Sequence, residues 1–506
     1  MKIALIADPH LSDLDGLPQD KALDWAINEI TKMKPDMAIW LGDITAFGSP
    51  VAAIRFDEKI RNAPFPSAVV PGNSDIRTPN TVPIMENFLF SHRKGFKIEN
   101  LLFVGMNTSR NIIPKEERRR LDTMETNCDV FLYCHQHPEA LDEDSRNYIT
   151  EWAKSRNVIM WAHGHIHVYR EHLFNGIPTL SLRALDPDKC SGGLSQIMEL
   201  DITNGKITKT SHDYTDEMPD TWSDNERQEF SEYLGITCYD IERDMKYAID
   251  EGILHLEWRS IPENSIDILE KWRSIGGRTF SLHMPSLDLV DGAVAGAERY
   301  KRYALNAVKA GADMITVHTP HVLNKYMRYE NGLFDAFADT AAEALLPVAE
   351  AGIDILVENN HTSFGNPDDI YETPYGCSPI AQIGWKNALN ERLGKNKCSL
   401  RFDIGHARNN IPISGEYPIG KWYGLYGKYI HSYHLHQTIC VKGGKMSNHH
   451  PITGWHDGFI AYDGFLRAWH DNTINHAPII LEIREGEGLP AIETWRRLKG
   501  MINNKM

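Results

Sequence analysis

The sequence predicts an α/β protein of two domains, the second of them a (β/α)8 barrel. Three observations lead to this prediction. The chain has 506 residues, too many for a single hydrophobic core. Short apolar segments alternate with amphipathic helical segments, and residues that bind metals follow many of the apolar segments. In the second half the alternation repeats eight times in about 270 residues, the size of a (β/α)8 barrel.

The first half carries an ordered series of potential metal ligands. Strands are expected at residues 2–7, 37–41, 67–70, 130–133 and 158–160, with a helix at 20–34. They are followed in turn by ADPH, GD, GNSD, CHQH and HGHIH. Each motif alone is weak evidence, because an Asp after a strand is usually a helix cap. Open α/β sheets place ligands at the carboxyl ends of strands, so the series as a whole predicts a metal centre.

This series resembles the calcineurin-like metallophosphoesterase family over about residues 1–215. The resemblance implies a β-sandwich flanked by helices (αββα), a phosphoester hydrolase and two divalent ions, Mn, Fe or Zn. By the resemblance, the first ion is held by Asp8, His10 and His167, the second by Asn73, His135 and His165, and Asp43 bridges the two. Two cations about 3.5 to 4 Å apart clamp a phosphoryl oxygen for in-line attack.

One position departs from the pattern of that family. The family usually has Gly-Asn-His-Asp/Glu where this chain has Gly72-Asn73-Ser74-Asp75. Ser74 can donate a hydrogen bond but cannot carry the positive charge of an imidazole. We therefore expect a diester or cyclic ester as substrate, with Asp43, Asn73 and Ser74 in catalysis and His163 or His137 in place of the missing histidine. A slow or degenerate enzyme is the alternative.

The second half is expected to be the barrel. We assign residues 1–215 to the metallophosphoesterase domain, 216–231 to a polar, acidic linker and 232–506 to the barrel domain. Barrel strands are expected at residues 235–239, 254–258, 279–283, 314–318, 353–358, 399–403, 432–436 and 478–482. Helical stretches such as 297–310 and 334–351 lie between them.

The ends of the expected barrel strands are rich in histidines and acids. They are His283, His318, Glu358, Asp403 with His406, His434 with His436, and Glu482. The carboxyl ends of all barrel strands converge on one face, so these side chains should meet there. Carboxylates and imidazoles together imply one or more divalent cations, Zn, Mn or Mg.

This half resembles the xylose isomerase-like barrel superfamily over about residues 234–500. That superfamily includes sugar and sugar phosphate isomerases and epimerases, and also endonuclease IV. The resemblance implies a shared metal site of Glu358, Asp403, His436 and Glu482, with His406 beside it. In the epimerase branch Glu358 and Glu482 would be the acid and base that move a proton.

The endonuclease-like branch of the superfamily carries more ligands, and most are present. His283 and His318 match two additional histidines, and Asn448-His449-His450 resembles an Asp-x-His motif. His450 is thereby a candidate ligand, while Asn448 replaces the expected aspartate. The ligand set of a third metal site is therefore incomplete in this sequence.

Composition limits the partners. The formal net charge of −16 disfavours a surface built for nucleic acid, so we expect no nucleic acid partner. The seven cysteines form no CxxC pair, which indicates reduced thiols. Because the N-terminal segment has the pattern of a strand and no long apolar run follows, we expect a cytoplasmic protein without a membrane partner. A homo-oligomer is compatible with the sequence.

These patterns predict a bifunctional metal-dependent enzyme. Its first domain would be a two-metal phosphodiesterase acting on a small phosphodiester, either linear or cyclic. Its barrel would be an isomerase- or epimerase-like enzyme for a sugar or sugar phosphate. Two alternatives stay open: a nucleic acid end-processing or repair enzyme with an endonuclease IV-like barrel, and a phosphoesterase regulated by a ligand-sensing barrel.

Overall fold

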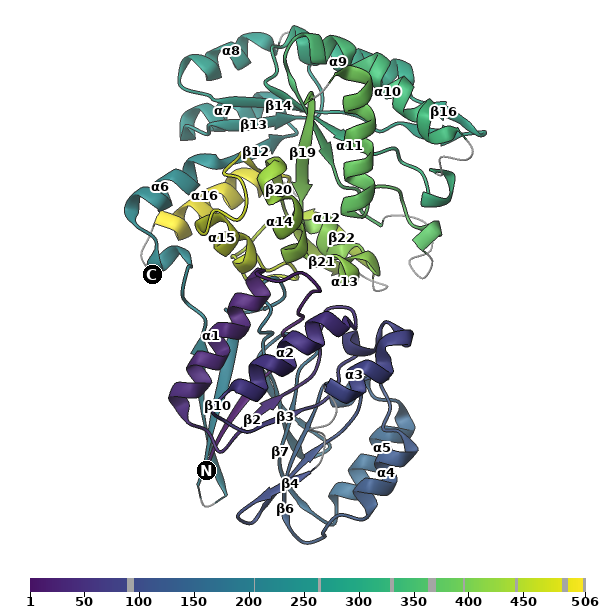
Figure 1. The fold of residues 1–506 in the computed structure, drawn as a ribbon. Coiled ribbons are helices and arrows are strands. Elements are labelled where there is room, and N and C mark those ends of the chain that lie inside the picture. The colour runs from purple at the N-terminus through teal and green to yellow at the C-terminus, as the bar shows by residue number, and fades with distance from the viewer. Residues whose placement is uncertain are drawn as a thin grey trace. The chain divides into compact units, whose positions relative to one another are not determined.

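The computed structural model describes most of the chain, in two units. The described residues are 1–88, 95–203, 205–262, 265–327, 332–362, 370–394, 396–441, 445–484 and 490–503. Contacts divide the chain into one unit of Met1–Asp216 with Ala461–Arg467 and another of Glu217–Ile460 with Ala468–Met506. In Figure 1 the first unit runs mainly from purple to blue and the second mainly from teal to yellow.

The first unit contains two β-sheets. One has the order β11-β10-β1-β2-β3 and the other β4-β5-β6-β7-β9-β8. The strands are β1 (Lys2–Ile6), β2 (Met37–Trp40), β3 (Ser67–Val69), β4 (Phe96–Ile98), β5 (Leu101–Gly105), β6 (Asp129–Cys134), β7 (Asn157–His163), β8 (Arg170–Phe174), β9 (Ile177–Ser181), β10 (Gln196–Thr203) and β11 (Lys206–Asp213). The helices are α1 (Pro18–Met33), α2 (Pro50–Asn62), α3 (Val82–Phe88), α4 (Lys115–Asp122) and α5 (Glu143–Ala153).

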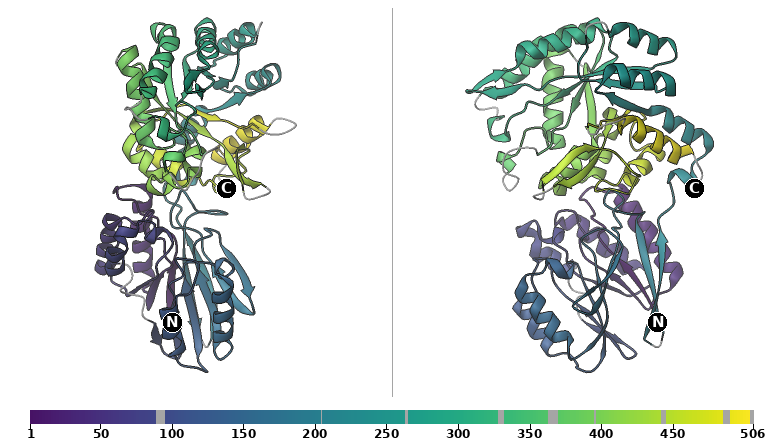
Figure 2. Two further views of the ribbon diagram at one scale, coloured as in Figure 1. Left: turned by 90° about the vertical axis from the view of Figure 1, so that its right-hand side faces the viewer. Right: turned by 180° about the vertical axis from the view of Figure 1, so that it is seen from behind.

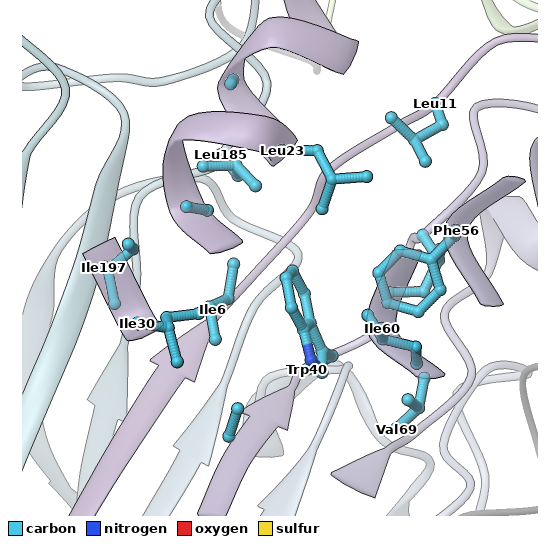
Figure 3. Packing of buried hydrophobic residues seen from close by; sticks show 14 of the residues in the cluster. Ile6, Leu11, Leu23, Ile30, Trp40, Phe56, Ile60, Val69, Leu185 and Ile197 are labelled. Atoms are coloured by element: carbon cyan, nitrogen blue, oxygen red, sulfur yellow. The ribbon is translucent and has the colours of Figure 1, made fainter. Parts of the chain in front are cut away.

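Three hydrophobic layers hold these elements together. Between the first sheet and its helices, Trp40 of β2 meets Phe56 of α2 edge-on at 5.0 Å between ring centroids, beside Ile30 of α1 (Figure 3). Successive residues of β1 alternate: Ile6 enters this layer and Leu5 the layer between the sheets. A third layer packs α4 and α5 on the second sheet. The predicted αββα sandwich is confirmed.

The segment expected to be a linker contains a helix. Within residues 216–231, α6 (Asp224–Tyr233) begins after Ser223. Ser223 and Glu226 form a capping box, and Phe230 is buried. The polar composition of the segment concealed this helix, because it has few apolar residues.

The second unit contains a closed barrel of eight parallel strands, as predicted. Its strands are β12 (Leu234–Cys238), β13 (His255–Trp258), β14 (Thr279–His283), β17 (Met314–His318), β18 (Asp354–Glu358), β19 (Cys398–Asp403), β20 (Ile430–Leu435) and β23 (Ile479–Leu481). Its longer helices are α7 (Ile241–Glu251), α8 (Ile266–Ser274), α9 (Ala297–Lys309), α10 (Leu333–Glu350), α11 (Pro379–Leu393), α14 (Ile419–Tyr426) and α16 (Pro490–Asn503). Helix α15 (Asp463–His470) belongs to the first unit as far as Arg467. Every predicted barrel strand overlaps an observed one.

Helices cover the outside of the barrel. Of these, α9, α10 and α11 lie side by side, as Figure 1 and the two further views of Figure 2 show. Two hairpins, β15 (Asp288–Val290) with β16 (Ala293–Ala295) and β21 (Gln437–Val441) with β22 (Lys445–His450), and the short helices α12 (Ile404–Asn409) and α13 (Ile413–Glu416) follow barrel strands. In the described ranges no helix has the length and apolar character needed to cross a membrane.

Candidate metal centres

The loops after the strands of the first unit form one group of metal-ligand side chains from Asp8, His10 and His167. The Nε2 atoms of His10 and His167 are 3.3 Å apart, and His167 Nε2 is 3.8 Å from Asp8 Oδ1. His10 is buried, and its pKa is lowered well below the ordinary value, chiefly by that burial. Because the imidazole is neutral, it can offer a lone pair to a cation.

A second group, of Asp43, His135 and His165, adjoins the first. His135 Nε2 lies 3.0 Å from Asn73 Oδ1 and 3.2 Å from His165 Nδ1. The other ring nitrogen of His135, Nδ1, donates to the carbonyl oxygen of Leu41 at 2.9 Å. That hydrogen bond fixes the tautomer and leaves the Nε2 lone pair for a metal, the usual arrangement of a histidine ligand.

Asp43 stands between the two groups. Its Oδ1 is 3.4 Å from His135 Nε2, and its Oδ2 is 3.8 Å from His10 Nε2. Ser74 holds both oxygens: its backbone N–H donates to Oδ1 at 2.7 Å and its hydroxyl to Oδ2 at 2.8 Å. Ser74 therefore positions Asp43, and its hydroxyl is already used when a substrate arrives.

The backbone of this site is strained at the ligands themselves. Five of the ligand residues adopt the left-handed conformation, which L-residues rarely do, with φ between 48° and 72°. They are Asp8, His10, Asp43, His165 and His167. Two glycines let the chain close around them. A Cβ on Gly72 would lie 2.1 Å from Asp43 Oδ1, and one on Gly164 would lie 2.6 Å from Asp8 Oδ2.

The charges of this site fit divalent cations. Burial, and then the neighbouring charge of Asp43, raise the pKa of Asp8 well above its ordinary value. Burial lowers the pKa of His165 to about 4. Carboxylates that repel each other, among neutral imidazoles whose nitrogens face one another, need a positive charge between them. The residues present therefore fit a pair of metal ions.

The two histidines expected to replace the family histidine lie near the second group. His163 is fully buried, and its Nδ1 donates to the carbonyl oxygen of Gly164 at 3.1 Å. Burial lowers the pKa of His163 to about 3, which disfavours the role of a proton donor. His137 is half-buried and stacks on His165 at 5.9 Å between ring centroids. Of the two, His137 is placed closer to solvent.

At the carboxyl ends of the barrel strands a further group unites His283, Glu358, His434 and Glu482. His434 Nδ1 lies 2.5 Å from Glu358 Oε1 and 3.3 Å from Glu482 Oε2. Glu358 Oε2 is 3.4 Å from His283 Nε2 and 3.3 Å from His318 Nε2. The single site of Glu358, Asp403, His436 and Glu482 that the resemblance implied is therefore divided, with Glu358 and Glu482 in this group beside His283 and His434.

The adjoining group consists of Asp403, His406, His436 and His449. His436 Nε2 is 3.1 Å from Asp403 Oδ1. His406 Nδ1 donates to the carbonyl oxygen of Asn359 at 3.1 Å, which leaves its Nε2 free for a metal.

The structure places His449 in this group, where the Asp-x-His motif had suggested His450. His449 has a φ of 68°, and this left-handed residue interrupts the alternation of side chains between the two faces of β22. The Nε2 of His450 lies 2.8 Å from Ser447 Oγ instead. Asn448 Oδ1 accepts hydrogen bonds from Asn409 and Thr438.

The barrel groups also offer unpaired ligand atoms that suit cations. Among the described residues, six buried ligand atoms have no hydrogen-bond partner: Nε2 of His283, His406 and His449, Oε2 of Glu358 and Glu482, and Oδ2 of Asp403. Burial lowers the pKa of His283 to about 3 and that of His318 to about 4. Unpaired polar atoms in a protein interior are costly, so the residues present fit one or more cations.

A buried charged layer supports the barrel groups from below. Arg401 is fully buried and contacts Glu257, and its Nη2 donates to Ser432 Oγ at 2.9 Å. Glu257 Oε1 is 3.0 Å from His434 Nε2. Sequence reasoning missed Arg401 and Glu257. A signal existed, because Arg401 precedes Asp403 by two residues in β19 and must share its face.

Comparison with known proteins supports the assignment of the first unit. Residues 1–169 match the calcineurin-like phosphoesterase family. The resemblance predicted for the N-terminal half is thereby confirmed. No curated protein matches the sequence.

Among solved structures, similar ones include a protein of Thermus thermophilus soaked with ZnCl2, at 18% identity, a TM-score of 0.36 and coverage of 53% of this chain and 97% of that one. D-psicose 3-epimerase of Clostridium cellulolyticum has 14% identity, a TM-score of 0.35 and coverage of 53% and 94%. An archaeal phosphodiesterase has 14% identity, a TM-score of 0.26 and coverage of 42% and 100%. The closed eight-stranded barrel is established by its own strand pairing.

The family match and the ligand groups together support a two-domain, metal-dependent enzyme.

Proposed function

We propose that the first unit is a two-metal phosphodiesterase for a small phosphodiester, either linear or cyclic. One observation carries this proposal: the two carboxylate oxygens of Asp43 face two separate groups of ligands, which suits a carboxylate that bridges two cations. Manganese, iron and zinc all suit a site of imidazoles and carboxylates. When bound, such ions supply Lewis acidity and a nucleophile at neutral pH.

The residues of the chain would orient this chemistry. His135, which lies 3.0 Å from Asn73 Oδ1, stands on one side of Asp43 and His10 on the other, and Ser74 fixes the carboxylate between them. Neither Ser74 nor the buried His163 is suited to protonate a leaving group. His137 is then the remaining candidate acid, and we propose a diester whose leaving oxygen needs little help from it.

Hydrolysis of bis(p-nitrophenyl) phosphate with added Mn²⁺, beside the monoester p-nitrophenyl phosphate, tests this proposal. Asp43→Asn should abolish diester turnover and reduce the amount of bound metal. Asp201→Asn, an exposed position on β10 of the same unit, is the matched control and should leave both unchanged. Full diester activity in Asp43→Asn would refute the proposal, and preference for the monoester would refute the diester specificity.

For the barrel we propose a metal-dependent isomerase or epimerase acting on a small sugar or sugar phosphate. Glu358 and Glu482 would be the proton-transferring pair, because both are buried at the strand ends within reach of His434. Zinc, manganese or magnesium would polarise the carbonyl group.

Incubation of the full chain with sugar phosphates in D2O tests the barrel proposal. Deuterium should enter at the carbon beside the carbonyl in the wild type and in Asp43→Asn. It should not enter in Glu358→Gln. Absence of exchange with every pentose and hexose phosphate tried would count against proton transfer.

A specific observation favours a second candidate for the barrel. Asp403, His406, His436 and His449 form a ligand group beside the first one, and a one-metal isomerase does not need it. A barrel with two cations suits hydrolysis of a phosphoester. Diesterase activity that persists in Asp43→Asn but disappears in Asp403→Asn would support this candidate. Binding of nucleic acid with a steep salt dependence would further assign it to strand processing.

A further inference from the structure

A cavity in the second unit opens over the barrel metal groups. It has a volume of about 380 Å³ and is bordered by His283, His318 and His406. Arginines also line it: Arg259 after β13 and Arg484 after β23, together with the exposed Arg299 of α9. Neither the predicted metal sites nor the proposed proton transfer uses these arginines.

Arg259 and Arg484 share the same two partners. Each donates from Nε to the hydroxyl of Tyr239, at 3.0 Å and 3.2 Å respectively. Each also reaches Oε1 of Glu482 with its Nη2, Arg484 at 2.8 Å. The side chain of Glu482 is fully buried, whereas those of Arg259 and Arg484 are 30% and 38% exposed. The two guanidinium groups therefore form the boundary between the buried centre and the cavity.

Arg259 and Arg484 have N–H donors and positive charge beyond what their described partners use. A guanidinium carries five N–H donors, and in the described part of the chain the Nη1 atoms of Arg259 and Arg484 donate to no residue. One carboxylate oxygen balances a single positive charge, yet two guanidinium groups converge on Glu482. Among the described residues, Glu482 is the one carboxylate paired with these two guanidinium groups, so an anionic ligand can balance the second charge.

The charges around the barrel metal groups also favour an anionic ligand. Four carboxylates and three guanidinium groups lie at this centre. The carboxylates are those of Glu257, Glu358, Asp403 and Glu482, and the guanidinium groups are those of Arg259, Arg401 and Arg484. A single divalent cation is enough to make this centre positive. Among the described residues that line the cavity, Asp288 is the one acid, and it lies 3.1 Å from His321.

We propose that Arg259 and Arg484 bind the phosphate group of the barrel substrate, so that the substrate class is a phosphate monoester. The fork of an arginine matches the geometry of a phosphate, and two of them can hold its oxygens while the reacting carbon reaches the metal groups. The inference rests on the proposed function in assuming that the barrel binds a substrate. It names the anionic group by which that substrate is held.

Binding of inorganic phosphate to the Mn²⁺-loaded full chain, measured by titration calorimetry, tests the inference. The wild type should show one phosphate site that Asp43→Asn removes and another that depends on the arginines. Arg259→Gln or Arg484→Gln should each weaken the second site by about tenfold, and the double variant by about 100-fold. Arg302→Gln, an exposed arginine of α9 outside the cavity, is the matched control.

A second pair of variants guards against loss of the fold or of the metals. Arg259→Lys and Arg484→Lys keep the charge beside Glu482 and should retain the metal content of the wild type, but they lose the fork and should still bind phosphate more weakly. Phosphate binding that is unchanged in the lysine variants, or in the double glutamine variant, would overturn the inference.

Acetate serves as the competing anion. If it displaced phosphate from this site at equal concentration, the site would belong to a carboxylate substrate and the phosphate assignment would be wrong. The readout needs no turnover, so an inactive isomerase leaves it intact. A barrel that turns over uncharged sugars while binding no phosphate would refute this inference alone.

Discussion

The two candidate metal centres are built in different ways. In the first unit the ligands lie on loops, and Asp8, His10, Asp43, His165 and His167 all have left-handed backbone. In the barrel, His283, His318, Glu358 and Asp403 are the last residues of regular strands, and of the grouped ligands described there only His449 has a positive φ. One centre depends on local backbone strain, while the other depends on the convergence of strands.

This difference determines what each centre needs from its surroundings. The first needs glycines, because an added methyl group at Gly72 or Gly164 would strike a ligand carboxylate. The barrel centre needs a support below it, which Arg401 and Glu257 provide. Substitutions of the first kind should displace a ligand of the first centre, at some cost in the stability of that unit because the new Cβ at Gly72 also meets the backbone of Asp43. Substitutions of the second kind should destabilise the barrel unit.

The largest expected effect comes from breaking the buried support. Arg401→Met leaves Glu257 buried without its main partner and should lower the free energy of unfolding of the barrel by about 3 to 5 kcal/mol. Chemical denaturation followed by a probe of the barrel measures this. Arg273→Met, which removes an exposed ion pair with Asp313, should cost no more than about 1 kcal/mol. Equal losses in the two variants would contradict the role given to the buried layer.

The next largest effect should be local to the first centre. Gly72→Ala places a Cβ against Asp43 and should reduce kcat/KM for the diester by about 100-fold, since small displacements of catalytic groups have effects of that size. Gly176→Ala introduces a methyl group at a left-handed position with no atom within 4 Å, so it separates the cost of backbone strain from that of a clash with a ligand. Metal content at the barrel should stay constant in both, and a fall there would show that the centres are not built independently.

A buried histidine of the barrel gives a pH-dependent test of the stability of that unit. His255 is buried, and burial lowers its pKa to about 4. The unfolded chain binds its proton near the ordinary value of 6.5, so the folded state loses stability as pH falls from 6.5 towards 4. At pH 5 the loss should be about 2 kcal/mol. Comparing urea denaturation of wild type and His255→Gln at pH 7 and pH 5 isolates this contribution, and parallel pH dependences would exclude it.

The smallest expected effect concerns Ser74. Because its hydroxyl holds Asp43, Ser74→Ala should lower kcat/KM by about tenfold, and by the same factor for diester and monoester. Ser74→Thr keeps the hydroxyl and should restore most of the activity. If Ser74→Ala changed the ratio of the two activities, Ser74 would act on the substrate directly, as its place in the motif had first suggested.

The ligands of the first centre were predictable because each motif follows a strand and the motifs come in a specific order. The eight barrel strands were predictable because apolar segments and helices alternate regularly. The choice between His449 and His450 was not, because it depends on one left-handed residue that breaks the period of β22. Helix α6 was missed because its cap and one buried Phe230 hold it, without an apolar stripe. Arg259 and Arg484 were missed because only the closed barrel brings them onto Glu482.

Closure of the barrel has a consequence for how the protein is made. The first strand, β12, pairs with the last, β23, and Glu482 follows directly after β23. This pairing has a high contact order, so closing the intervening chain is entropically costly and slow. A nascent chain therefore exposes unpaired parallel strands until the segment that carries β23 leaves the ribosome. The ligand group that includes Glu482 is therefore complete only after the last strand has been made.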